Sequence, residues 1–96
     1  SGQIALDLDG NLVNDSIGKE THQVFKNLNA ILEASKLNFE HVLKVSIFLK
    51  NMDDFEKVNA VYADYFKADT APARETVQVA KLPKNVNIEI SLIAGK

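Results

Sequence analysis

Two segments with helical spacing alternate with segments of strand-like alternation, and this order restricts the chain to folds that pack helices against a sheet. Residues 16–35 and 53–67 repeat apolar side chains every three or four positions, the spacing that one buried helix face requires. Residues 42–49, 74–80 and 86–94 alternate apolar and polar side chains, as half-buried strands do. A strand tail over residues 3–8 ends at the turn signal Asp9-Gly10-Asn11. The sequence predicts one α+β domain over residues 1–96, with both helices on one face of a sheet.

Capping residues mark where each helix begins. Asp15 or Ser16 can cap the first helix, and Asp53 followed by Glu56 forms a capping-box pattern for the second. The polar side of the first helix, predicted to face solvent, consists of Lys19, Glu20, Lys26, Asn27 and Glu33.

Composition excludes several classes of function. The formal net charge is -2 and no basic cluster occurs, so nothing favours nucleic-acid binding. No apolar run approaches the roughly twenty residues of a membrane-spanning helix. The chain has no cysteine, and His22 and His41 lie far apart in the sequence, so neither a disulfide framework nor a metal centre is predicted.

Alternation divides the last two strands into two faces. Val77 and Val79, together with Val86, Ile88, Ile90 and Leu92, are predicted to face the helices. The opposite face would then carry Arg74, Thr76, Gln78, Asn87, Glu89, Ser91, Ile93 and Phe48. Because this set is too polar for a core yet contains exposed apolar side chains, we expect it to form an interface between subunits.

Arg74 and Glu89 are the main candidates for chemistry on that face. Arg74 is the only arginine beside ten lysines, and its guanidinium can bind a carboxylate through two parallel hydrogen bonds. Glu89 is an acid in a strand whose other members are apolar or small. Taken alone, an arginine at a strand start is more often a surface ion-pair partner than an anchor, and a glutamate in a strand is usually a solvated residue.

The chain resembles the RidA family, also called YjgF/YER057c/UK114, over essentially all of its length. The resemblance rests on the segments Ser1-Gly2-Gln3-Ile4, Val58-Asn59-Ala60-Val61-Tyr62, Pro72-Ala73-Arg74, Leu82-Pro83-Lys84 and Ile88-Glu89-Ile90. It implies a chorismate-mutase-like fold with a mixed sheet, a homotrimer and ligand clefts between neighbouring subunits. The first strand of the family, most of its second and a cleft tyrosine precede Ser1 in this alignment, so we expect the chain to be truncated at its N-terminus.

The resemblance implies hydrolysis of reactive enamines and imines, such as 2-aminoacrylate and 2-iminobutanoate, to 2-keto acids and ammonia. Arg74 would hold the substrate carboxylate, and Glu89 would activate the attacking water. Asn59, Thr76 and Gly2 would line the cleft, and no cofactor or metal would be needed. The family implies a cytoplasmic or mitochondrial-matrix location, and a small 2-imino or 2-keto acid as the ligand.

Two departures and two other functions remain open at the level of sequence. Thr76 replaces a cysteine that many members carry, and Glu75 replaces a small residue, although alternation points its side chain away from Arg74. Asn59 could be a polar residue on a helix face and Thr76 a β-branched strand former. The alternative functions are a non-catalytic member that binds a small carboxylate or a protein, with a regulatory, chaperone-like or translation-inhibiting role, and an inert fragment.

Overall fold

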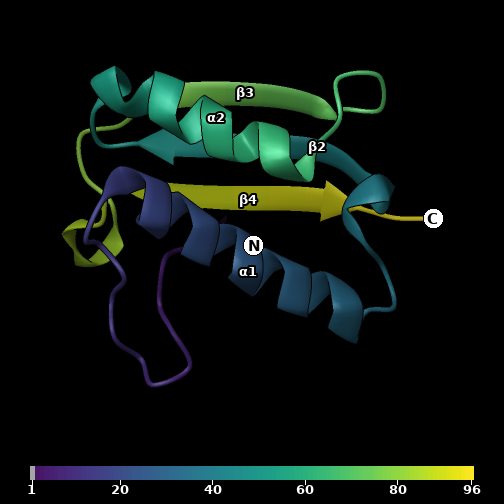
Figure 1. The fold of residues 1–96 in the computed structure, drawn as a ribbon, viewed down its shortest axis with the longest axis horizontal. Helices are drawn as coiled ribbons and strands as arrows, with labels where there is room; N and C mark the ends of the chain where they lie inside the picture. Colours follow the sequence, from purple (N-terminus) through teal and green to yellow (C-terminus); the bar gives the residue numbers. More distant parts are fainter. Residues whose placement is uncertain (1) are drawn as a thin grey trace.

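The computed structural model describes residues 2–96 and has two layers, a four-stranded sheet and two helices that cover one of its faces (Figure 1). In chain order the elements are β1 (Gly2–Gln3), α1 (Ile17–Ala34), β2 (Val42–Leu49), α2 (Phe55–Tyr65), β3 (Ala73–Gln78) and β4 (Ile88–Ala94). Short 3-10 turns at Phe39–His41, Met52–Asp54 and Pro83–Asn85 lie between them. The predicted α+β arrangement is confirmed.

The sheet is mixed, with the strand order β1-β4-β2-β3. Strand β4 pairs antiparallel with both β1 and β2, whereas β2 and β3 are parallel. Parallel neighbours require a crossover connection, and α2 supplies it by packing over β2 and β3 (Figure 1). Strand β3 therefore forms one edge of the sheet.

The first helix begins and ends close to the predicted positions. Ser16 is the N-cap, and its hydroxyl oxygen accepts a hydrogen bond of 3.2 Å from the backbone N–H of Lys19. The buried face of α1 consists of Glu20, Thr21, Val24, Phe25, Leu28 and Leu32.

Glu20 was predicted to lie on the solvent-facing side of α1, but this is wrong because the residue is only 1 % exposed. Its two carboxylate oxygens accept hydrogen bonds of 2.8 Å from the backbone N–H and the side-chain amide of Asn87. A buried carboxylate is tolerated when such bonds satisfy it, and the helical repeat places Glu20 above Val24 on the buried stripe. Asn87, predicted on the open face of the sheet, instead ties α1 to the start of β4.

The second helix begins differently from the prediction. The side chain of Asn51 accepts a hydrogen bond from the backbone N–H of Asp53 and starts a 3-10 turn that leads into α2. Asp54 occupies the N-cap of α2 without a capping side-chain bond, so the predicted capping box at Asp53 and Glu56 is wrong. The apolar stripe of α2 is confirmed, with Val58, Val61 and Tyr62 buried.

The core lies between the helices and the sheet. Its sheet side consists of Val45, Ile47 and Leu49 from β2 and Ile88 and Ile90 from β4, all completely buried. Aromatic rings of α1, α2 and the following residue fill the space opposite, with Phe25 stacked on Tyr65 at 4.5 Å between centroids. No helix within residues 2–96 is long and apolar enough to cross a membrane.

Candidate functional site

Arg74 lies near the start of β3 and reaches α2. Its backbone pairs with Val45 of β2, and paired residues of neighbouring strands project to the same side of a sheet. Because Val45 is fully buried under the helices, Arg74 also faces the helix side. There its Nη1 group donates a hydrogen bond of 2.6 Å to Oδ1 of Asn59 in α2. This bond orients the guanidinium fork and leaves its other N–H donors for a ligand.

Two aromatic rings of α2 lie against the guanidinium. The Cζ atom of Arg74 is 4.5 Å from the ring centroid of Tyr62 and 5.6 Å from that of Phe55, both within the range of cation–π attraction. Burial raises the pKa of the Tyr62 phenol, and the positive charge of Arg74 acts in the opposite direction. The phenol therefore stays neutral at physiological pH while its ring contacts the cation.

Thr76 lies two residues beyond Arg74 and pairs with the buried Ile47, so it shares the helix side of β3. Its hydroxyl oxygen is buried and has no hydrogen-bond partner among residues 2–96. Buried polar atoms are normally satisfied. The Thr76 hydroxyl is therefore an unsatisfied polar group on the helix side of β3.

Glu89 and Gly2 form a separate pair on the other side of the sheet. Ile88 and Ile90 are completely buried under the helices, so Glu89 between them points to the open face. A Cβ atom at Gly2 would overlap Oε2 of Glu89 and would lie 2.9 Å from its Cδ. The missing side chain of Gly2 therefore provides the space that the carboxylate of Glu89 occupies.

The sheet separates the candidate residues into two groups. Arg74, Asn59 and Thr76 gather at β3 and α2 on the helix side, whereas Glu89 and Gly2 gather on the open side. The prediction that Arg74 and Glu89 share one face is wrong within a single chain.

The error arises in β3, where Val77 was predicted to face the helices but lies on the open face of the sheet. Val77 pairs with Phe48 and is 42 % exposed on the open face. On the helix side, the rings of α2 are covered by the guanidinium of Arg74, as long basic side chains can do. Gln78 also lies on this side, and its Oε1 atom accepts a hydrogen bond of 2.7 Å from the backbone N–H of Met52.

The open face carries apolar side chains among polar ones. Its apolar members include Phe48, Val77 and Ile93, of which Ile93 is 59 % exposed. Glu75 accepts a hydrogen bond of 2.9 Å from the Ser46 hydroxyl and pairs with Lys44 at 3.5 Å. The prediction that Glu75 points away from Arg74 is confirmed, and the charge of Glu75 is engaged on the open face.

The contacts of Tyr62 and Phe55 with Arg74 were not predicted from the sequence. The signal was present in their spacing, because Phe55, Asn59 and Tyr62 stand four and three positions apart and so share one face of α2.

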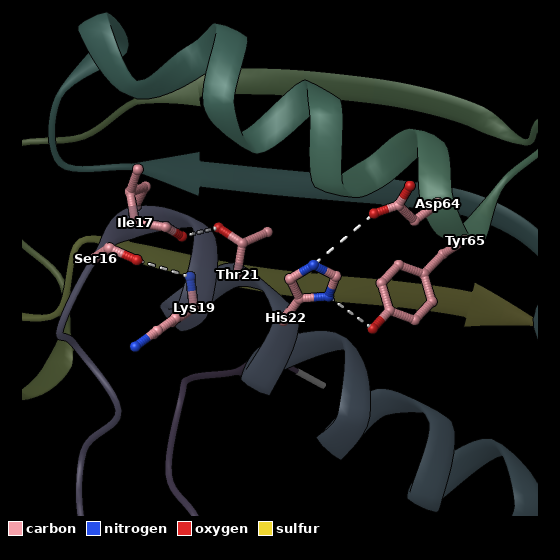
Figure 2. A network of polar contacts seen from close by, with 7 residues as sticks. All are labelled: Ser16, Ile17, Lys19, Thr21, His22, Asp64 and Tyr65. Atoms are coloured by element: carbon pink, nitrogen blue, oxygen red, sulfur yellow. Dashed lines mark hydrogen bonds and ion pairs between the residues drawn. The ribbon is translucent and has the colours of Figure 1, made fainter.

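His22 has inter-helix contacts that the sequence did not predict (Figure 2). Its Nδ1 atom lies 3.1 Å from the Tyr65 hydroxyl, and its Nε2 atom lies 3.8 Å from Oδ2 of Asp64. Burial, followed by the negative charge of Asp64, raises the pKa of Tyr65, so the phenol keeps its proton at neutral pH. The three side chains join α1 to α2.

Within residues 2–96, no group of three or more histidine, aspartate or glutamate side chains is arranged to hold a metal ion. The candidate residues themselves carry a guanidinium, a carboxylate, a hydroxyl and an amide.

The fold and these residues define a small α+β protein with a guanidinium fork on the helix side of its sheet and a separate carboxylate on the open side. The family model described as Endoribonuclease L-PSP matches residues 1–96, and the chain belongs to that family, which includes the RidA and YjgF proteins.

Two relatives illustrate the similarity. Human 2-iminobutanoate/2-iminopropanoate deaminase is 42 % identical over 95 residues, which cover 98 % of this chain and 69 % of the human protein. The YjgF gene product of E. coli is 40 % identical in sequence to this chain. Its crystal structure superposes on this one with a TM-score of 0.90, over 98 % of this chain and 76 % of that one.

A third relative carries a ligand. The crystal structure of E. coli TdcF with bound serine is 34 % identical to this chain and has a TM-score of 0.92, covering 100 % of this chain and 77 % of the TdcF chain.

Proposed function

We propose that the protein hydrolyses small 2-imino acids and their enamine tautomers, such as 2-iminobutanoate and 2-aminoacrylate, to 2-keto acids and ammonia. The observation that carries this proposal is the Arg74 fork, which Asn59 orients through a hydrogen bond of 2.6 Å. The human relative named as a deaminase supports the reaction class. The serine bound to TdcF supports a small amino-acid-like ligand.

The reaction requires positioning and proton transfer. Arg74 binds the substrate carboxylate. Glu89 accepts a proton from a water molecule while the oxygen of that water attacks the imine carbon. Return of that proton to nitrogen gives a carbinolamine, whose collapse to the ketone breaks the C–N bond and releases ammonia. Holding the imine and the water in attack geometry lowers the barrier of such a step by several kcal/mol.

Because Arg74 and Glu89 lie on opposite sides of one sheet, the proposed site needs a second copy of the chain. In this proposal the Arg74 group of one subunit meets the Glu89 and Gly2 group of its neighbour in a homotrimer. The exposed Ile93 and Val77 on the open face are apolar side chains of the kind that a subunit interface covers.

A coupled assay tests the proposed activity. The protein is added to a threonine dehydratase reaction, and formation of 2-oxobutanoate is followed over time. We expect the protein to accelerate keto-acid release, and we expect Glu89→Gln to remove the acceleration because an amide does not accept the proton from water. Glu40→Gln is the matched control, since Glu40 is exposed on a turn. Equal acceleration by Glu89→Gln would contradict the role of this carboxylate, and ligand binding without acceleration would favour a non-catalytic member of the family.

Gly2→Ala tests the space around Glu89. The added methyl group would overlap Oε2 of Glu89, so the carboxylate must rotate away while the flexible side chain absorbs the strain. We expect kcat/KM to fall about tenfold to a hundredfold, as misplacement of a catalytic group by about 1 Å does, with little change in Tm. Gly18→Ala is the control, because the nearest contact of its Cβ would be Ser16 Oγ at 3.9 Å. Full activity of Gly2→Ala would rule out the proposed position of Glu89.

A further inference from the structure

The ring of Tyr62 has two distinct environments. The residue is 8 % exposed and packs on Phe66 at 4.7 Å and on Phe25 at 6.3 Å between centroids. The same ring also lies 4.5 Å from Cζ of Arg74. Tyr62 therefore connects the buried aromatic cluster of the core to the candidate binding group.

The phenol hydroxyl of Tyr62 makes no hydrogen bond with any residue in the range 2–96. Removing this hydroxyl would break no bond, so any influence of Tyr62 on Arg74 acts through the ring. Phe55 offers a second ring at 5.6 Å. A guanidinium is planar and stacks readily on aromatic faces, and a surface arginine without such support loses considerable side-chain entropy when a ligand orders it.

We propose that Tyr62, assisted by Phe55, is a positioning residue that holds the Arg74 guanidinium in the orientation that binds the substrate carboxylate. The rings constrain the plane of the group, and Asn59 constrains its rotation within that plane through the 2.6 Å bond to Nη1. The fork is thus ordered before the ligand arrives, which lowers the entropic cost of binding. The substrate part of this inference rests on the proposed function, whereas the positioning itself does not.

Arg74 can be observed directly because it is the only arginine in the chain. Its Nε–Hε group gives a single side-chain signal in a proton–nitrogen NMR spectrum, and neighbouring aromatic rings shift that signal. We expect Tyr62→Leu to move the signal towards the position of a free arginine and to sharpen it. Tyr62→Phe should restore the wild-type shift, because it keeps the ring. Phe55→Leu should cause a smaller displacement, and it serves as the second variant if Tyr62→Leu fails to fold.

Phe39→Leu is the matched control for loss of an aromatic ring. Phe39 is half-buried and packs on Phe66 at 5.4 Å and on Phe25 at 6.0 Å, so it belongs to the same cluster. We expect this variant to lower Tm without moving the Arg74 signal. An Arg74 signal that is unchanged in both folded Tyr62→Leu and folded Phe55→Leu would overturn the proposal.

Calorimetric titration with 2-oxobutanoate measures the consequence for binding. The Kd should rise about tenfold in Tyr62→Leu, the change expected when a partly desolvated cation–π contact is lost, and Tyr62→Phe should restore it. In the coupled assay, KM should rise while kcat changes little, because the affected contact exists before the transition state. A displaced Arg74 signal with no binding of 2-oxobutanoate to the wild type would contradict the proposed function and leave the positioning role established. A displaced signal with unaltered Kd would overturn the binding role of the rings.

Discussion

Arg74→Ala should reduce kcat/KM for imine hydrolysis about a hundredfold or more and should leave the fold intact. Truncating one partner of a hydrogen-bonded charge pair costs about 2–5 kcal/mol, and alanine removes every donor that the proposed carboxylate contact uses. The side chain is exposed in the free chain, so its loss should lower Tm by only a few degrees. Arg74→Lys should recover part of the activity, because an ammonium keeps the charge but not the fork or the stacking on Tyr62.

The measurement is a steady-state titration of kcat/KM in the coupled assay, with circular dichroism and solution mass as checks on fold and assembly. Lys26→Ala is the charge-matched control, because Lys26 is exposed on α1 and its loss changes the net charge equally. Activity of Arg74→Ala within twofold of Lys26→Ala would show that the carboxylate is bound elsewhere.

Mixing two inactive variants should restore activity if the site is shared between subunits. In a random mixture of equal amounts of Arg74→Ala and Glu89→Gln chains, half of the subunits supply an intact Arg74 group and half supply an intact Glu89 group. A site built from two chains combines both intact groups in about a quarter of cases, whatever the size of the closed ring. We therefore expect about a quarter of wild-type activity from co-refolded subunits, against almost none from either variant alone.

The control for this experiment uses the same exchange of subunits. A mixture of Arg74→Ala with the double variant Arg74→Ala/Glu89→Gln contains no intact Arg74 group and should stay inactive. If the first mixture also stays inactive after subunit exchange is demonstrated by mass, the two residues do not act together across an interface. The proposed two-chain site would then be abandoned.

Several local features followed from the sequence because they depend on neighbouring residues. The helical repeat located α1 and α2, and Ser16, one of the two predicted cap candidates, is the N-cap of α1. Strand β2 coincides with the predicted Val42–Leu49. The alternation in β4 also indicated its buried side, because Ile88 and Ile90 are too apolar to lie elsewhere in a central strand.

Two of the failures involve contacts between residues distant in sequence, and one concerns a local helix start. Glu20 appears polar in any local pattern, yet Asn87, 67 residues further along, satisfies its carboxylate inside the protein. The N-terminus of α2 was assigned to Asp53, but Asn51 starts the preceding turn. The contact of Tyr62 with Arg74 was not predicted, because it depends on β3 returning beside α2.

The sequence by itself determined the order of helices and strands, the buried stripe of α2 and the residue types available for binding an anion. Only the tertiary structure decided which side of β3 carries Arg74, and so which candidate residues meet. Alternation has a period of two and divides a strand into two sets, but in β3 neither set is apolar enough to be assigned to the buried face. The register of β3 with β2 decides which set faces the helices. The aromatic rings of α2 on that side favour contact with the guanidinium of Arg74, and Val77 lies on the open face.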